Sequence, residues 1–313
     1  MIVRATSIQL LLSITLHLWG GVRIAAQPAF PDTIAFITTE QNNIVVPAVV
    51  NGTDTLMLMF HSSFRGVSLT ENGFAKSRSM TLDGLGTGLS WGGSNDTPVS
   101  LLNTIRFGTS SWDSVMITID VNSGPGSDGK FGYDLFAGKV VRVDHGGGWF
   151  IVQDDLPKDL SQYEALPITV TDHGLLVDAS LTLADSTYTD QFMIHTGFGG
   201  TCIVGTDLHT RLPPAAVMDT LGVQELKDSF GHVLRNVVTR ASRFQLGRAE
   251  VPDLPIQLMD ERSQFGVNVL GNDLLRRYDL LIDLRHDRLF IRPVGTASQG
   301  VFGPDPMPGR AGY

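Results

Sequence analysis

The chain has 313 residues, enough for two domains or one large one, and its 23 Lys and Arg against 32 Asp and Glu give a formal net charge of -9. This negative charge repels a phosphate backbone and argues against a nucleic-acid partner. Only 18% of residues are charged while 34 are Gly and 15 are Pro, a balance that predicts mostly β structure with many turns. The single cysteine, Cys202, excludes an internal disulfide and a cysteine-based zinc site.

The first element in chain order is an export signal over residues 1–26. Arg4 supplies positive charge, Ile8 to Trp19 is apolar, and small residues precede Gln27. The apolar run is shorter than the about 20 residues that span a bilayer. We expect cleavage after Ala26 and a mature protein in the periplasm or secreted, without a membrane span.

The remaining sequence contains one plan twice. Each copy starts with an alternating strand, a turn and a second apolar strand that runs into a histidine. The first copy reads Asn43–Asn51, then Leu56–Phe60 and His61-Ser62-Ser63; the second reads Leu175–Leu183, then Tyr188–Ile194 and His195-Thr196-Gly197. This periodicity is typical of hairpins of half-buried strands.

Three further matches follow in the same order. IRFG ending at Gly108 corresponds to FQLG ending at Gly247, and DGKFGYDLF corresponds to FGVNVLGNDLL, with Gly132 and Gly271 also 139 residues apart. Each copy closes with a predicted hairpin, Val140–Val152 or Asp279–Pro293. Short helices are expected at Thr70–Ser77, Asp207–Leu212, Ala215–Leu221 and directly after Gly132 and Gly271.

This repeat sets the expected domain organisation. We assign 27–152 to an N-terminal lobe, 153–167 to a polar linker, 168–294 to a C-terminal lobe, and 295–313 to a disordered tail rich in Gly and Pro. Two copies of such a unit are expected to pack as lobes about a pseudo-two-fold axis.

This order of motifs resembles that of the aspartic peptidases. In that family two apolar residues precede the catalytic loop, and two apolar residues, a Gly and a closing hairpin follow later in the chain. The likeness is nearest to retropepsin-like peptidases fused in tandem and covers Asn43 to Pro293. Its most specific piece is VLGNDLLRRYDLLIDLRHDRLFIRP, and DGKFGYDL is the second. The resemblance implies a mostly β, bilobal fold with two pseudo-symmetric β-barrel-like lobes around a central cleft. It also implies that Gly132 and Gly271 lie where a neighbouring backbone passes close by.

The chain departs from that family at the catalytic positions, where His61 and His195 replace Asp. The aspartic mechanism needs two carboxylates about 3 Å apart that share one proton. Two imidazoles do not reproduce this, so we expect no pepsin-type proteolysis. Ser63 stands where the family has Gly, whereas Ser62 and Thr196 keep the hydroxyls that the resemblance implies for hydrogen bonds between the lobes. The residues expected to support the cleft loops are Ser62, Ser63, Thr196, Gly197, Gly132 and Gly271.

Three roles for the histidine pair stay open. The two neutral rings can hold the cleft in shape through a hydrogen bond. They can bind zinc, although spacing forces no third ligand. Asp207, His209 and Cys202 follow the second loop, but Asp207 fits the start of a short helix and Cys202 a small buried apolar residue. Or a histidine can act as a general base on Ser62, Ser63 or Thr196, although no orienting acid is evident.

The glycine-rich run Gly84–Gly93 is predicted to be a strand or flap beside the cleft, with Trp91 lining it, because it lacks the ending of a phosphate-binding loop. The sequence therefore predicts an exported pseudopeptidase that binds an extended peptide or an unfolded protein segment, as a monomer and without a cofactor. The alternative is a hydrolase that uses His61 and His195, directly or through a bound metal.

Overall fold

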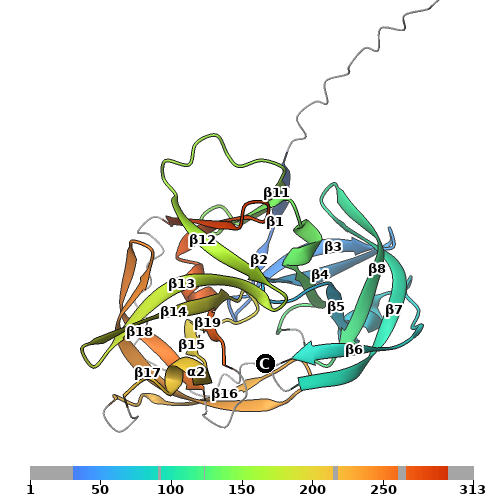
Figure 1. Ribbon diagram of the computed structural model, residues 1–313. Helices are drawn as coiled ribbons and strands as arrows, with labels where there is room; N and C mark the ends of the chain where they lie inside the picture. The colour runs from blue at the N-terminus through green and yellow to red at the C-terminus, as the bar shows by residue number, and fades with distance from the viewer. Residues whose placement is uncertain (1–30, 91–92, 123, 214–217, 260–265, 295–313) are drawn as a thin grey trace, which may run out of the picture.

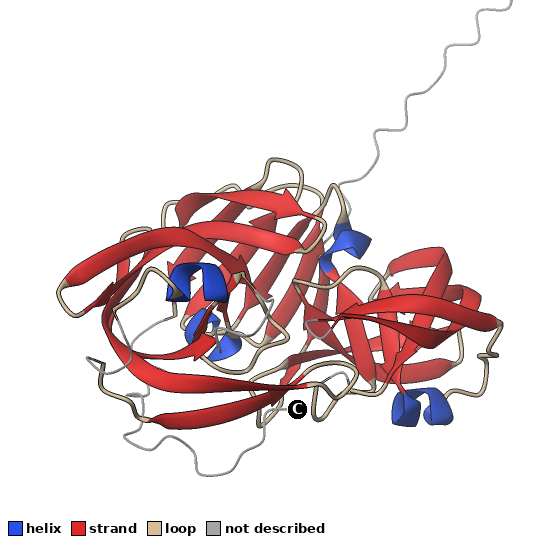
Figure 2. Ribbon diagram, turned by 60° about the horizontal axis from the view of Figure 1, so that its bottom comes forward, coloured by secondary structure: helices blue, strands red, loops and turns tan. Residues whose placement is uncertain are grey.

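The computed structural model describes residues 31–90, 93–122, 124–213, 218–259 and 266–294, and these residues form mostly β strands (Figure 2). The predicted signal peptide at 1–26, Trp91 and the predicted tail at 295–313 lie outside the described residues. No helix within the described part of the chain is both long and apolar enough to cross a bilayer.

The first half carries strands that are mostly short and two short helices. The strands are β1 (Asp32–Ala35), β2 (Ile37–Thr38), β3 (Ile44–Val50), β4 (Asp54–His61), β5 (Val67–Thr70), β6 (Gly84–Ser90), β7 (Gly93–Phe107), β8 (Ser110–Asp120), β9 (Gly129–Gly132), β10 (Val140–Asp144) and β11 (Trp149–Gln153). The helices are α1 (Glu71–Lys76) and the 3₁₀ helix η1 (Tyr133–Phe136).

The second half repeats this order. Its strands are β12 (Glu164–Thr171), β13 (Gly174–Leu183), β14 (Ser186–Ile194), β15 (Cys202–Val204), β16 (Gly222–Lys227), β17 (Val233–Leu246), β18 (Ala249–Met259), β19 (Asn268–Leu270), β20 (Tyr278–Asp283) and β21 (Arg288–Pro293). Its helices are α2 (Thr206–His209) and α3 (Asn272–Leu275).

The strand pairings repeat as the sequence motifs do. Every pairing among β2 to β9 recurs, with the same direction, ten strands later along the chain. For example, β4 pairs in parallel with β9 and β14 with β19, while β5 pairs in parallel with β8 and β15 with β18. The internal repeat in the sequence is therefore also a repeat in topology.

Each half closes a ring of strands. In the first half β3, β4, β9, β5, β8 and β7 follow one another and the pairing of β3 with β7 closes the ring. In the second half β13, β14, β19, β15, β18 and β17 do the same, closed by β13 with β17. Figure 1 shows the blue to green strands of the first ring on one side and the yellow to orange strands of the second on the other.

A continuous sheet joins the two halves. Strand β10 of the first half pairs antiparallel with β20 of the second, from Val140 opposite Asp283 to Val143 opposite Leu280. The two closing hairpins, β10–β11 and β20–β21, were expected from the sequence, but the pairing between them was not. Because this pairing is made of backbone hydrogen bonds, it fixes the position of one ring relative to the other.

Buried aromatic rings fix the strand ends that lead to the site. Phe60 is fully buried directly before His61 and packs against Phe131 of β9 and Phe150 of β11, with ring centroids 5.5 and 5.1 Å away. In the second half Phe192 of β14 packs edge-to-face on Phe244 at 5.8 Å. Such packing of large rings orients the end of each strand.

Several boundaries differ from the expectations. Helix α1 matches its prediction, with the Thr70 hydroxyl accepting from Gly73 N at 2.9 Å as an N-cap, and α2 ends earlier than predicted, at His209. The predicted helix at 215–221 lies partly outside the described residues, and 218–221 are not helical. β11 and β12 take up Gln153 and residues 164–167 of the predicted linker, so 154–163 connect the halves.

Candidate functional site

The structure brings the two histidines together. His61 is the last residue of β4, and His195 follows directly after β14, the equivalent strand of the second half. Their ring centroids lie 4.6 Å apart with 54° between the ring planes. The pair therefore lies at the junction of the two halves, one ring from each.

Four buried hydrogen bonds tie the two histidine loops to each other. The Ser62 hydroxyl donates to Ile194 O at 2.6 Å and accepts from Thr196 N at 3.0 Å. The Thr196 hydroxyl donates to Phe60 O at 2.6 Å and accepts from Ser62 N at 2.9 Å. The arrangement is reciprocal, and it is the one the resemblance implied for these two hydroxyls. It holds the loops, and with them the histidines, in a fixed relation.

Two glycines let the loops fold over β9 and β19. A Cβ on Gly132 would come within 2.8 Å of Arg65 Cα, and one on Gly271 within 2.7 Å of Phe198 O. Both lie in the extended region with φ of −90° and −104°, so lack of space, not backbone conformation, requires glycine. The expected close approach at both positions is confirmed.

The His61 ring is enclosed by residues of both loops. Its Nδ1 lies 3.2 Å from the Ser63 hydroxyl, and a Cβ at Gly197 would overlap the opposite edge of the ring. The Phe64 ring lies edge-on, with its centroid 5.9 Å from that of His61. Gly197 thus leaves the space that the larger ring needs, whereas Ser63 supplies a hydroxyl partner to it.

Burial keeps both histidines neutral. Desolvation, then His195 and then the Lys130 charge lower the pKa of His61 well below its usual 6.5. Desolvation, with a smaller contribution from Lys130, lowers the pKa of His195 to about 4. Both rings are therefore uncharged at neutral pH, and each offers one N–H and one bare nitrogen.

A buried ion pair beside the histidines was missed by the sequence analysis. Lys130 of β9 and Asp120 at the end of β8 are each 3% exposed, and Lys130 Nζ lies 2.8 Å from Asp120 Oδ2. Lys130 also donates to the Ser229 hydroxyl at 2.7 Å, and its Nζ lies 4.6 Å from the centroid of the Phe64 ring. The sequence contained one signal for it. Asp120 and Lys130 are charged, whereas their equivalents 139 residues later, Met259 and Val269, are apolar and fully buried, so the repeat marks two charges at core positions.

The candidates for further metal ligands are used elsewhere. His209 Nδ1 contacts Met259 O at 2.6 Å, and Cys202 is buried among apolar residues, where desolvation raises the pKa of its thiol. Among the described residues, no three His, Cys, Asp or Glu side chains gather closely enough to hold a metal ion. What the described site offers a metal is the two imidazoles.

Two other histidines lie in the turns of the closing hairpins and differ in exposure. His286 has 61% of its side chain exposed, and its Nδ1 lies 2.7 Å from Asp283. His145 packs edge-on against Phe36, and burial lowers its pKa to about 4. The pairing of β1 with β11 brings Phe36 over that turn, since Phe36 N donates to Gly148 O at 3.1 Å.

Comparison with known proteins adds no relative to this description. No protein-family model matches the chain, and no curated protein matches it.

Proposed function

We propose that this chain is a bilobal relative of the aspartic peptidases that has lost peptide cleavage and binds an extended peptide or unfolded protein segment in its central cleft. We further propose that it acts as a monomer after export to the periplasm or the exterior. The repeated strand pairings and the reciprocal bonds of Ser62 and Thr196 support the family assignment.

The observation that carries this proposal is the contact of the two imidazoles at 4.6 Å in loops tied by those bonds. In the peptidase mechanism one carboxylate accepts a proton from water while its partner donates one to the substrate carbonyl. Two neutral imidazoles lack the shared proton, and two imidazolium rings would repel each other. The pair supports a fixed cleft better than an acid–base cycle.

The sheet edges support peptide binding. Within the described residues, β6 and β16 each end a sheet and pair on one side alone, with β7 and β17. An extended peptide can add to such an edge through backbone hydrogen bonds, with little demand on its sequence. Monomeric binding fits because each half supplies one histidine loop and one edge strand.

The test combines cleavage and binding on the purified protein. Unfolded protein substrates are incubated with it from pH 3 to 8, with chelator and with added zinc, and a labelled extended peptide is titrated in parallel by fluorescence anisotropy. We expect saturable peptide binding and no cleavage. Absence of binding by any unfolded segment would remove the binding proposal.

A hydrolase is the second candidate, and the contact between the Ser63 hydroxyl and His61 Nδ1 at 3.2 Å is what favours it. In that case His61 takes the proton of Ser63, or the two histidines hold a metal. Cleavage that disappears in His61→Ala or His195→Ala would establish this candidate in place of the first, and loss on chelation would distinguish the metal route.

A further inference from the structure

The turn between β16 and β17 reaches across to the first half of the molecule. Asp228 organises this turn: its carboxylate accepts from Phe230 N at 2.9 Å and His232 N at 2.8 Å, and lies 2.8 Å from His232 Nδ1. The turn residues Ser229 and Phe230 then project toward β6, β8 and β9. The turn is thus a preformed loop that presents two residues to the other half.

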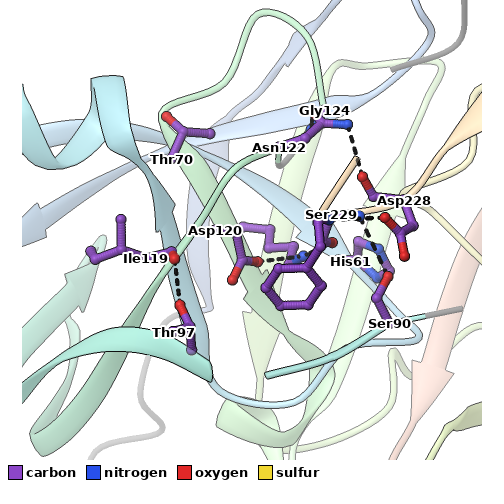
Figure 3. A network of polar contacts seen from close by, with 12 residues as sticks. His61, Thr70, Ser90, Thr97, Ile119, Asp120, Asn122, Gly124, Asp228 and Ser229 are labelled. Carbon is purple, nitrogen blue, oxygen red and sulfur yellow. Dashed lines mark hydrogen bonds and ion pairs between the residues drawn. The ribbon is translucent and has the colours of Figure 1, made fainter. Parts of the chain in front are cut away.

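Ser229 is held by the first half at three atoms. Its carbonyl accepts from Asn122 N at 3.0 Å, its hydroxyl accepts from Lys130 Nζ at 2.7 Å, and its own N donates to the Ser90 hydroxyl at 3.4 Å. Figure 3 shows Ser229 among Ser90, Asn122 and Asp120, with His61 in the same close-up. A protein that recognises an extended peptide binds its main-chain groups and a side chain together, as the first half binds Ser229.

Phe230 lies against a glycine of the β6 edge strand. A Cβ added to Gly88 would come within 2.6 Å of Phe230 Cζ, so the absence of a side chain at Gly88 makes room for the ring. An aromatic ring seated on backbone in this way contributes apolar contact next to the polar contacts of Ser229.

The first half is polar where it receives Ser229, whereas the equivalent position in the second half is apolar. Val269 and Met259, the repeat equivalents of Lys130 and Asp120, lie in an apolar cluster with Ile203. A buried lysine costs stability unless its N–H groups are used, and here Asp120 takes one and the Ser229 oxygen another. The first half therefore keeps the buried ammonium of Lys130 as a donor to the hydroxyl oxygen of Ser229.

We infer that Asn122, Lys130 and Gly88 form a peptide subsite in the first half that selects a Ser or Thr followed by an aromatic residue, and that Ser229 and Phe230 of this chain occupy it as an internal ligand. An incoming peptide of this kind displaces the β16–β17 turn. This inference rests on the peptide binding proposed above and names the sequence that the cleft selects.

The experiment removes the side chains of Ser229 and Phe230 from the subsite and measures which peptides then bind there. The peptide fluorescein-Asp-Ser-Phe-Gly-His-NH₂, which copies residues 228–232, is titrated by anisotropy against the wild type and against Ser229→Gly/Phe230→Gly. We expect at least tenfold tighter binding by the double variant, because the two side chains that compete for the subsite are removed. The peptide with Ser replaced by Ala is expected to bind the variant about tenfold more weakly, because it lacks the bond to the charged Lys130 donor. The peptide with Phe replaced by Gly is expected to lose about as much, because it lacks the apolar contact of the ring with Gly88.

A second variant tests the Lys130 and Asp120 side chains that receive Ser229. Lys130→Val/Asp120→Met, placed in the Ser229→Gly/Phe230→Gly background, copies the second half and leaves no unpaired buried charge. It should lose the preference for Ser over Ala while retaining the native circular dichroism spectrum. If it does not fold, the hydrogen exchange of the Ser229 N–H in the wild type replaces it: its protection must fall when the peptide with Ser and Phe is added, because the turn moves away from the Ser90 hydroxyl.

The outcomes separate the two proposals. Equal binding of the Ser and Ala peptides, or equal binding by the Ser229→Gly/Phe230→Gly and wild-type proteins, overturns the subsite while leaving general peptide binding intact. Failure of every peptide to bind either protein overturns both.

Discussion

The two imidazoles in contact, of which His195 is buried and His61 half-buried, contribute to how this protein responds to acid. In the unfolded chain a histidine titrates near pH 6.5, whereas burial lowers the pKa of His195 to about 4 and lowers that of His61 in the same direction. Because the native pKa is lower, the unfolded state binds more protons between these values. The contribution of these two histidines to the free energy of unfolding is therefore complete above pH 6.5 and decreases as pH falls toward 4.

We predict that His195→Gln flattens this pH dependence. The shift of His195 corresponds to about 3 kcal/mol of unfolding free energy lost between pH 7 and pH 4 in the wild type. Urea unfolding at several pH values should show that the variant loses correspondingly less over this interval. The exposed His173→Gln is the matched control and should follow the wild-type curve; a parallel curve for His195→Gln would contradict the assigned cause.

A second prediction at this scale concerns space at Gly132. Its neighbours are backbone atoms of Phe64 and Arg65, which cannot move aside without shifting the His61 loop. Gly132→Ala should therefore lower the unfolding free energy by about 1–3 kcal/mol, as overpacking does. Gly84→Ala is the control, since nothing lies within 4 Å of its added Cβ and its effect should stay within about 0.5 kcal/mol. Denaturant midpoints of the two variants give the comparison.

At the scale of the elements, the loops after β4 and β14 depend on each other. Thr196→Val keeps the shape of the side chain but leaves Ser62 N and Phe60 O without their buried partner. We predict a loss of about 2–3 kcal/mol, because buried groups left unsatisfied carry their full desolvation cost. Thermal or urea unfolding measures it.

The matched control lies on β14, the strand that precedes the Thr196 loop. Thr189 of β14 forms a hydroxyl pair with Ser180 at 2.8 Å in an exposed position. Because water replaces that bond, Thr189→Val should cost less than about 0.5 kcal/mol. Similar losses for the two valine variants would mean that the Ser62 and Thr196 network does not stabilise the loops.

Much at this scale was predictable because the signals were local. The alternation of Ile44–Val50 and Gly174–Leu183 gave the strands, and the hydroxyls of Ser62 and Thr196 gave the bonds between loops once the resemblance placed them. The ion pair of Lys130 and Asp120 was not predicted, since β8 and β9 flank β5 on opposite sides and the two residues meet across it. The contact of Ser229 with Lys130 joins residues 99 apart and depends on how the halves assemble.

At the scale of the whole molecule, the two halves share one architecture but differ in charge. The repeat places Lys130 and Asp120 in the first half where the second has Val269 and Met259. Lys130 contributes to lowering the pKa of both histidines. The same ammonium beside two carboxylates would favour ionisation of both and oppose the shared proton that acid peptidases need. The two histidines are therefore not the only difference between this site and a working acid pair: the charge of Lys130 is a second, and Ser63 in place of glycine is a third.

We accordingly predict that His61→Asp/His195→Asp remains inactive and that adding Lys130→Val/Asp120→Met brings out peptide cleavage with an acid optimum. The four changes introduce two acids and give the first half the apolar pair that the second half already carries. Hydrolysis of a fluorogenic peptide from pH 3 to 6 measures this. His61→Asn/His195→Asn with the same two apolar changes is the matched control, equal in size but without a carboxyl group. Cleavage by the double variant alone would contradict the role of Lys130, whereas a folded, inactive quadruple variant would argue that the histidine loops do not hold the geometry of an acid pair.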